Sequence, residues 1–430
     1  MKKLLYLILG TLLSLTSCTK IDNWDGPDAQ IHGRVIDSYT GENILSSQGE
    51  WGIRIWERSW TESVPTDQSL PVKQDGSYNN TKVFSGTYDM LPYGGPFWPV
   101  DTVKNVVFNG NSEQDFTVTP YLQIIDFETK LDGLKLMLKC RLKAPIRDGL
   151  PNLVEIKPFL SLNEFCGATS FIDNADYDNT RIQINRSWAD EVGDADTSGV
   201  YYIGPLQVNA GYTYNVRLGA NVNDANQHYN YSNVVNIEVP EDAVNDTTEV
   251  DNYLSNAAWP FSRSDWDGTR WGNLSGGWVT NAAMRSRGDG QYGGYDGGWT
   301  AGTDEQSLGF EYWGDSETPI VDGKLYQTLD LPAGDYRFTL SFAGDNPIVS
   351  NSGDDPRYIV VAAGETLPDI DDVSSSSLGY KSFAGLGTDG ATSFVFSLDA
   401  PTKVAVGLVV NFTDAQQNVR LSWLKVERIY

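Results

Sequence analysis

Short segments in which apolar and polar residues alternate, separated by turn residues, follow one another along the chain from residue 31 onwards. Residues 134–142 are the clearest case, because Leu-Lys-Leu-Met-Leu-Lys-Cys-Arg-Leu is apolar at every second position. A period of two is typical of a β-strand that buries one face. After the first 17 residues we find no amphipathic helix of ten or more residues. The sequence therefore predicts an all-β protein made of β-sandwiches.

Turn-rich and acidic stretches divide this pattern into three β-domains. We expect sandwiches over residues 30–120 and 121–240, an acidic linker over 241–252, and a third domain over 253–430. The third region holds seven of the thirteen tryptophans. Within it, residues 324–331 and 336–342 alternate on either side of a Pro-Ala-Gly-Asp turn, which predicts a hairpin. The glycine-rich residues 288–299 predict a loop or a strand edge.

The first residues have the features of an export signal. Two lysines precede an apolar run that ends at Leu15, and Thr16-Ser17-Cys18 follows. This run is too short to span a bilayer permanently, so residues 1–17 are predicted to be a signal peptide. The segment around the cysteine resembles a lipobox, which implies a lipid-modified Cys18 and a tether over residues 18–29. An ordinary secretory signal with a chance cysteine is the alternative.

The composition argues against several kinds of partner and site. A formal net charge of −26 is unfavourable for nucleic acid, which requires a clustered positive surface. The chain has two histidines and lacks a Cys-x-x-Cys pair, which weakens schemes based on zinc or a Ser-His pair. With Cys18 assigned to the lipid, the other cysteines are Cys140 and Cys166. They could form a disulfide or be two buried thiols, and both alternatives are compatible with export.

Two motifs resemble known domain families. The order "G-x-V-x-D…T-G-E…D-G-S-Y…G-x-Y" within residues 30–120 resembles a prealbumin-like, carboxypeptidase-regulatory-like domain. The segment "Y-Q-T-L-D-L-P-A-G-D-Y-R-F-T-L-S-F" with "V-R-L-S-W-L-K-V" resembles the galactose-binding-like jelly roll used by many carbohydrate-binding modules. The whole arrangement resembles surface lipoproteins of Bacteroidetes glycan-uptake loci. This resemblance implies outer-membrane anchoring at the cell surface and non-catalytic capture of an oligosaccharide or polysaccharide beside a TonB-dependent transporter.

A sugar site needs flat apolar platforms beside planar polar groups, and the third region offers both on its loops. If residues 324–342 form a hairpin, the loops that flank it lie at one end of the sheet. Asn418 is a candidate by resemblance, because the loop before the last strand of such modules often contributes an amide. The candidate ligand-binding residues are Trp271, Tyr295, Trp299, Trp313, Asp345, Asn346, Arg357 and Asn418.

Each aromatic candidate has a structural alternative. Trp423 alternates with Val419 and Leu421, so we expect it in the core, and Trp259 and Trp278 flank apolar stretches. A structural calcium at the acidic loop 369–372 is compatible with the galactose-binding-like resemblance, although no Asp-x-Asp-x-Asp-Gly motif is present. No other cofactor is expected. A surface scaffold or adhesin without a ligand, and a glycosidase with two carboxylates, are the rival functions.

Overall fold

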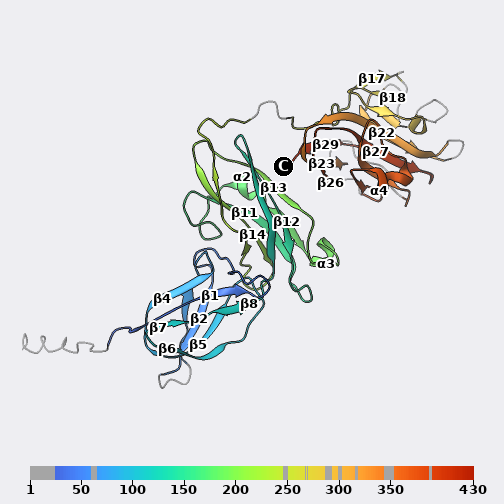
Figure 1. Ribbon diagram of the computed structural model, residues 1–430. Helices are drawn as coiled ribbons and strands as arrows, with labels where there is room; N and C mark the ends of the chain where they lie inside the picture. Colours follow the sequence, from blue (N-terminus) through green and yellow to red (C-terminus); the bar gives the residue numbers. More distant parts are fainter. Residues whose placement is uncertain are drawn as a thin grey trace, which may run out of the picture. The chain divides into compact units, whose positions relative to one another are not determined.

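The computed structural model describes residues 25–59, 65–245, 250–266, 268, 270–285, 293–298, 303–314, 318–342, 353–386 and 390–430. The chain forms two compact units, Met1–Val244 and Asn245–Tyr430 (Figure 1). Strands dominate both units, so the prediction of an all-β protein is confirmed. The described helices have at most four residues: α2 (Ala175–Asp178), α3 (Trp188–Glu191), α4 (Val373–Ser376), η1 (Ala283–Arg285) and η2 (Ile370–Asp372). None of these described helices has the length and apolar character that a membrane crossing requires.

The first unit begins with two four-stranded sheets that enclose one hydrophobic cluster. One sheet has the order β4-β1-β7, with β8 also pairing with β1 in parallel; it contains β1 (Ala29–Asp37), β4 (Ser77–Val83), β7 (Asn111–Glu113) and β8 (Phe116–Val118). The other has the order β3-β2-β5-β6 and contains β2 (Gly52–Glu57), β3 (Gln68–Pro71), β5 (Gly86–Tyr93) and β6 (Val103–Phe108). Ile31, Val35 and Ile53 are among the side chains sealed between them.

Two further sheets follow in the same unit. The three-stranded sheet β13-β10-β9 contains β9 (Gln123–Asp132), β10 (Lys135–Lys143) and β13 (Tyr201–Gln207). The five-stranded sheet around β14 contains β11 (Leu153–Ser161), β12 (Ile182–Arg186), β14 (Thr213–Val222), β15 (Asn230–Tyr231) and β16 (Val235–Glu238). Leu136, Leu138, Cys140 and Leu142 are fully buried, as the alternation over residues 134–142 predicted.

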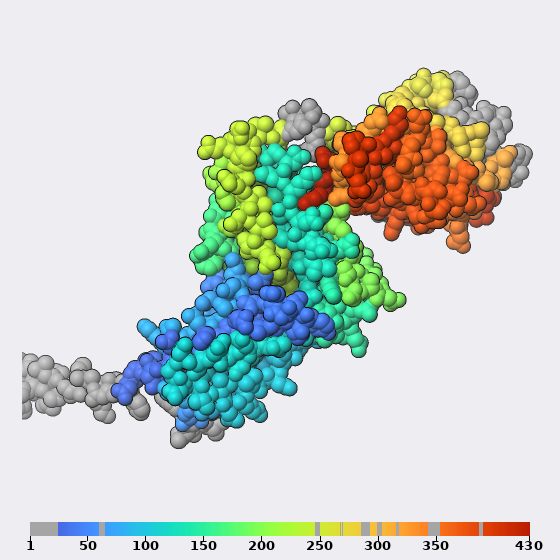
Figure 2. Space-filling view, in the orientation of Figure 1, coloured from blue at the N-terminus to red at the C-terminus, as the bar shows by residue number. Residues whose placement is uncertain are grey.

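Side chains from these two pairs of sheets meet within the first unit. Tyr231 Oη donates to Glu50 Oε2 at 2.9 Å, and Arg217 Nη2 donates to the carbonyl of Ser46 at 2.7 Å. Figure 2 shows the corresponding blue and green surfaces in continuous contact. The described part of the first unit is therefore one compact body with three hydrophobic clusters.

Cys140 and Cys166 are separate free thiols, which answers the question that the sequence left open. Cys140 points into the core between the sheets of β10 and β14. Cys166 lies in a different cluster, beside Phe159 and Tyr231, and its Sγ is 3.3 Å from the carbonyl of Phe159. The disulfide alternative is therefore not realised in the structure, because the two thiols occupy different hydrophobic clusters.

The described residues of the second unit form three antiparallel sheets. The first, β17-β18-β20-β21-β28, contains β17 (Arg263–Trp266), β18 (Trp271–Leu274), β20 (Gly293–Asp296), β21 (Ser307–Tyr312) and β28 (Gln417–Leu421). The second, β19-β22-β27-β24-β25, contains β19 (Val279–Thr280), β22 (Ile320–Leu331), β24 (Arg357–Ala363), β25 (Gly379–Ser382) and β27 (Thr402–Phe412). The third, β26-β23-β29, contains β23 (Gly334–Ser341), β26 (Ala391–Leu398) and β29 (Trp423–Arg428).

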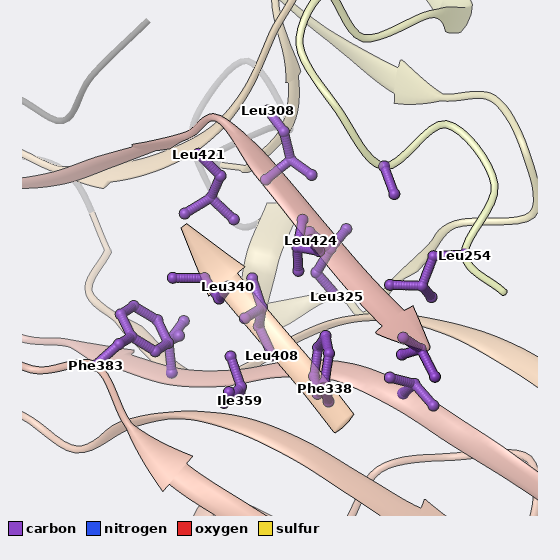
Figure 3. Close-up of a cluster of buried hydrophobic side chains, with 14 of the residues drawn as sticks. Leu254, Leu308, Leu325, Phe338, Leu340, Ile359, Phe383, Leu408, Leu421 and Leu424 are labelled. Atoms are coloured by element: carbon purple, nitrogen blue, oxygen red, sulfur yellow. The ribbon is translucent and has the colours of Figure 1, made fainter. Parts of the chain in front are cut away.

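All three sheets contribute to one core. Leu308 and Leu421 come from the first sheet, Leu408 from the second and Leu340 from the third, and Figure 3 shows their side chains pointing toward one another. Each is completely buried. Burial of this kind contributes roughly 1.5–3 kcal/mol per large aliphatic side chain, so the shared core holds the three sheets together.

The predicted hairpin over residues 324–342 is wrong. β22 pairs with β19 and β27, whereas β23 pairs with β26 and β29, so the turn at Pro332 connects two different sheets. β23 alternates as predicted, whereas residues 325–327 of β22 are all buried. Leu325 and Phe338 lie in the same core. Alternation identifies a strand and its buried face, but it does not say which strand lies next to it.

Trp423 is only half-buried, which corrects its assignment to the core face of Val419 and Leu421. The chain leaves β28 at Leu421 and enters a different sheet as β29 at Trp423, and the buried positions there become Leu424 and Val426. The alternation therefore shifts by one residue at Ser422, and the tryptophan moves off the core face.

The glycine-rich segment also differs from the prediction where the structure describes it. Residues 293–296 form β20, which lies between β18 and β21 in the interior of its sheet. A Cβ atom at Gly293 would lie 2.6 Å from the sulfur of Met284, and one at Gly294 would lie 2.9 Å from the carbonyl oxygen of Gly272. The glycines are therefore explained by close packing inside the sheet and not by a loop.

Candidate functional site

A pocket of about 340 Å³ opens on the sheet that contains β18, β20, β21 and β28. We call it the Trp271–Trp313 pocket. It is lined by Arg270, Trp271, Asp296, Phe310, Glu311, Trp313, Asn418, Val419 and Arg420. Its volume lies in the range of small-molecule sites.

The pleat of the sheet explains which side chains reach the pocket. Successive side chains on a strand point to opposite faces. Tyr295, Phe310 and Val419 face the core, so their neighbours Asp296, Glu311 and Asn418 lie on the other face. Glu311 and Asn418 are directly opposite each other on β21 and β28.

A network of two arginines and two carboxylates lies in the wall of the pocket. Arg270 donates from Nε to Asp296 Oδ1 at 3.1 Å and from Nη2 to Glu311 Oε2 at 2.7 Å. Arg420 Nε donates to Asp296 Oδ2 at 3.0 Å. The side chains of Asp296 and Glu311 are only 2% and 3% exposed, so this network is shielded from water.

The two carboxylates determine the charge state of Arg270. Burial alone would lower the pKa of this guanidinium, but hydrogen bonds and Coulombic attraction from Asp296 and Glu311 outweigh burial and raise it above its ordinary value. Arg270 Cζ also lies 4.8 Å from the centre of the Trp271 ring. The arginine therefore stays charged and fixes the position of the indole.

Two uncharged donors in the pocket lining have no hydrogen-bond partner among the described residues. These donors are Trp271 Nε1 and Asn418 Nδ2. Trp271 is 4% exposed and Asn418 is 5% exposed. An unsatisfied buried donor costs about 1–3 kcal/mol, and most buried polar atoms in native proteins are satisfied. Two such donors in one pocket indicate that hydrogen-bond acceptors from a ligand belong there.

Two glycines on neighbouring strands lie on the same face of the sheet as the pocket carboxylates. Gly294 and Gly309 are paired across β20 and β21, on the same face as Asp296 and Glu311. A Cβ atom at Gly309 would lie 3.0 Å from the carbonyl oxygen of Val419 and 3.3 Å from Cγ of Arg420. The space between the strands is thus taken by the arginine and not by a side chain at Gly309.

Three of the predicted ligand-binding residues meet at this pocket: Trp271, Trp313 and Asn418. Trp313 is 39% exposed, as a platform for a ligand should be. Cys18, Trp299, Asp345 and Asn346 lie outside the described residues, and the predictions for them stay predictions.

Tyr295 and Arg357 were predicted to contact ligand, but the structure buries both and places neither in the pocket lining. Tyr295 is completely buried in the core of the second unit, where its Oη accepts a hydrogen bond from Arg263 Nη1 at 3.0 Å. Arg357 is also completely buried and does not line the pocket. It donates to the carbonyls of Asp355 and Gly353, both at 3.0 Å, and so holds the loop before β24 in place.

The other tryptophans that the structure describes in the second unit are not part of the pocket lining. Trp278 packs partly buried against the core, as expected. Trp259 was expected in the core but is 39% exposed, and its Nε1 donates to the carbonyl of Glu305 at 3.1 Å. Trp259 therefore has the same exposure as Trp313 without lining the pocket.

Arg420 and Glu311 were not predicted as site residues, although each is a charged residue between two apolar residues of a strand. Arg420 lies between Val419 and Leu421, and Glu311 lies between Phe310 and Tyr312, so each is the charged member of an alternating strand. Such positions usually face water. Here Arg420 pairs with Asp296 and Glu311 pairs with Arg270, so neither charge needs to face water.

In the acidic loop predicted as a calcium candidate, the carboxylate of Asp369 pairs with an ammonium group. Lys324 Nζ lies 2.5 Å from Asp369 Oδ1 and 3.1 Å from Asp322 Oδ2. Hydrogen bonding and Coulombic attraction from Lys324 lower the pKa of Asp369. Within the described parts of the chain, no group of three or more His, Cys, Asp or Glu side chains is arranged to hold a metal.

Comparison with known families identifies a domain in each unit. Residues 29–119 match the family described as the N-terminal domain of a protein of unknown function, DUF3823. Residues 255–407 match the family described as a domain of unknown function, DUF5013. No curated protein matches the chain. Neither family description states an activity.

Several solved structures resemble half of the chain. A protein from Bacteroides uniformis described as a "putative carbohydrate binding protein" is 28% identical, with a TM-score of 0.40. DUF3823 family proteins from Bacteroides uniformis and Parabacteroides merdae are 22% and 21% identical, with TM-scores of 0.41 and 0.39. Each match covers 50% of this chain and 100% of the other.

Proposed function

We propose that this protein is a non-catalytic carbohydrate-binding lipoprotein whose second unit captures an oligosaccharide in the Trp271–Trp313 pocket. The observation that supports this proposal is the pocket itself. It combines an exposed indole at Trp313, a second indole at Trp271 and an amide at Asn418 above a fixed network of charges. Aromatic faces pack against the CH-rich faces of sugars, and planar polar groups orient the hydroxyls.

We place the protein at the outer membrane, facing the cell exterior and anchored through lipid on Cys18. The lipobox-like segment supports the anchor. A lipid-anchored binder raises the local concentration of its ligand, so its partner in this proposal is a TonB-dependent outer-membrane transporter. The first unit then serves as a spacer or docking platform between anchor and binding domain.

Binding to a glycan array by the lipid-free chain, residues 19–430, tests the proposal, with titration calorimetry on the glycans that bind. Trp313→Ala should weaken binding at least about tenfold, because it removes the exposed platform while leaving the core intact. Trp259→Ala is the matched control, since Trp259 is equally exposed and does not line the pocket.

The rival functions give different results in the same experiment. Release of shorter products from a bound glycan would identify an enzyme. Absence of binding across the array would favour a structural surface protein. If Trp313→Ala and Trp259→Ala weaken glycan binding equally, the Trp271–Trp313 pocket is not the binding site.

A further inference from the structure

The described charged side chains in the lining of the Trp271–Trp313 pocket balance one another. Arg270 and Arg420 contribute two positive charges, and Asp296 and Glu311 contribute two negative charges. Each arginine donates to at least one of these carboxylates. A carboxylate or sulfate on a ligand would find both guanidinium groups already neutralised. The free-energy cost of removing that anion from water would then not be offset by a new ion pair. The charge balance thus favours an uncharged sugar.

The two uncharged side-chain atoms of the lining that have no partner in the described part of the chain, Trp271 Nε1 and Asn418 Nδ2, are both donors. Trp271 Nε1 can only donate, and Asn418 Nδ2 can only donate. A sugar hydroxyl that accepts from one of them must still place its own proton on an acceptor. A carbonyl oxygen accepts two hydrogen bonds and donates none. It therefore satisfies such a donor without needing an acceptor for a proton of its own.

The two donors lie on strands that flank the pocket. Trp271 is on β18 and Asn418 is on β28, with β20 and β21 between them. Three strand spacings amount to about 14 Å between the two backbones. Side chains that reach inward from both edges suit a ligand longer than one sugar ring, with an acceptor toward each edge.

We infer that the pocket selects an uncharged oligosaccharide that carries N-acetyl groups. An acetamido carbonyl accepts from Trp271 Nε1 or Asn418 Nδ2, and the sugar ring packs on the exposed face of Trp313. This inference rests on the proposed function, because it names the sugar class for the same pocket.

Calorimetry on the lipid-free chain with matched disaccharides tests the inference. The probes are N,N′-diacetylchitobiose against cellobiose, N-acetyllactosamine against lactose, and a uronic-acid disaccharide of the cellobiose linkage. The acetylated member of a binding pair should bind at least tenfold more tightly than its parent, and the uronate should bind most weakly. The dissociation constant should be the same at 50 and 500 mM NaCl, because screening does not affect an uncharged ligand.

Two conservative variants connect the preference to the two donors. Trp271→Phe keeps an aromatic wall and removes Nε1, and Asn418→Leu keeps the volume and removes Nδ2. At least one of them should reduce the affinity ratio between acetylated and parent sugar, whereas Trp313→Ala should weaken both sugars and leave the ratio unchanged. Circular dichroism and the melting temperature verify that each variant is folded. The comparison of acetylated and parent sugars uses the wild-type protein, so it does not depend on the folding of any variant.

The outcomes separate the inference from the proposed function. Equal affinities within the binding pair, or tightest binding by the uronate, would overturn the inference and keep a carbohydrate-binding pocket. No binding by any array glycan or by any of the five disaccharides would overturn the proposed function, and the inference with it.

Discussion

Arg270 Nη2 donates to Glu311 Oε2 at 2.7 Å, although 41 residues separate the two along the chain. The contact spans β20, since Arg270 directly precedes β18 and Glu311 is on β21. Asp296, on the strand between them, accepts from the same guanidinium. One arginine thus connects three neighbouring strands beneath the pocket, and the shape of the pocket depends on this connection.

Asp296→Asn should destabilise the second unit by about 3–5 kcal/mol, because it leaves Arg270 and Arg420 with one carboxylate instead of two in a shielded site. Asparagine has nearly the same volume, so packing is retained. Urea unfolding followed by tryptophan fluorescence measures the change.

Glu365→Gln is the control for that measurement. It breaks the ion pair with Lys403 at 3.3 Å, in which the two side chains are 76% and 47% exposed. An exposed pair of this kind should change the unfolding free energy by less than about 1 kcal/mol. If the two variants unfold at the same urea concentration, the buried network does not stabilise the second unit.

The sequence predicted the strands well because burial imposes a period of two that can be read directly. The alternation over residues 134–142 and the apolar positions Val419 and Leu421 are buried as expected. Three candidate site residues also share the pocket, since aromatic and amide side chains next to glycine and charge are typical of binding surfaces.

The pairing of strands and the environment of single side chains could not be predicted in the same way. The partner of β22 depends on long-range packing, and the shift at Ser422 depends on a change of sheet. Tyr295 lies between glycine and aspartate and so resembled a loop residue, but it faces the core from an interior strand. Buried charge networks join residues far apart in the chain, and no local pattern reports them.

Gly33→Ala should destabilise the first unit by roughly 1–3 kcal/mol. A Cβ atom at Gly33 would lie 1.9 Å from the carbonyl oxygen of Gln114 and 2.9 Å from Tyr78 Oη, which itself donates to that carbonyl. Calorimetric melting measures the effect.

Gly26→Ala is the matched substitution, because a Cβ atom there would meet nothing within 4 Å. Its melting temperature should equal that of the wild type. A Gly33→Ala protein that melts at the wild-type temperature would show that β1 can move away from Gln114 at little cost.

Cys18→Ala should abolish lipid attachment if the proposed anchor is correct. In cells fed an alkyne-labelled palmitate, the wild-type protein should carry label and sediment with membranes, and the variant should carry none. Cys140→Ala and Cys166→Ala are controls that should keep the label. Label on the Cys18 variant would mean that the lipid is attached at another residue, which would contradict the proposed anchor.

The two thiols of the first unit should be unreactive in the folded protein and reactive in the unfolded one. Burial raises the pKa of Cys140 from its ordinary value of 9.0 to about 12 and that of Cys166 to about 11. In the lipid-free chain at pH 8, a thiol reagent should therefore modify neither cysteine in buffer and both in denaturant without reductant. If unfolded protein shows no reactive thiol before reduction, a disulfide joins them after all.

The same pKa shift makes the stability of the first unit depend on pH. The folded state holds the Cys140 proton to about pH 12, whereas the unfolded chain releases it near pH 9. The contribution of this thiol to stability is thus complete below pH 9 and decreases as the pH rises toward 12, by at most about 1.4 kcal/mol per pH unit. Cys140→Ala should show a shallower loss of unfolding free energy between pH 8 and 10, measured by urea titration. Parallel curves for the wild type and the variant would mean that the thiol is already ionised, or accessible to water, in the folded state.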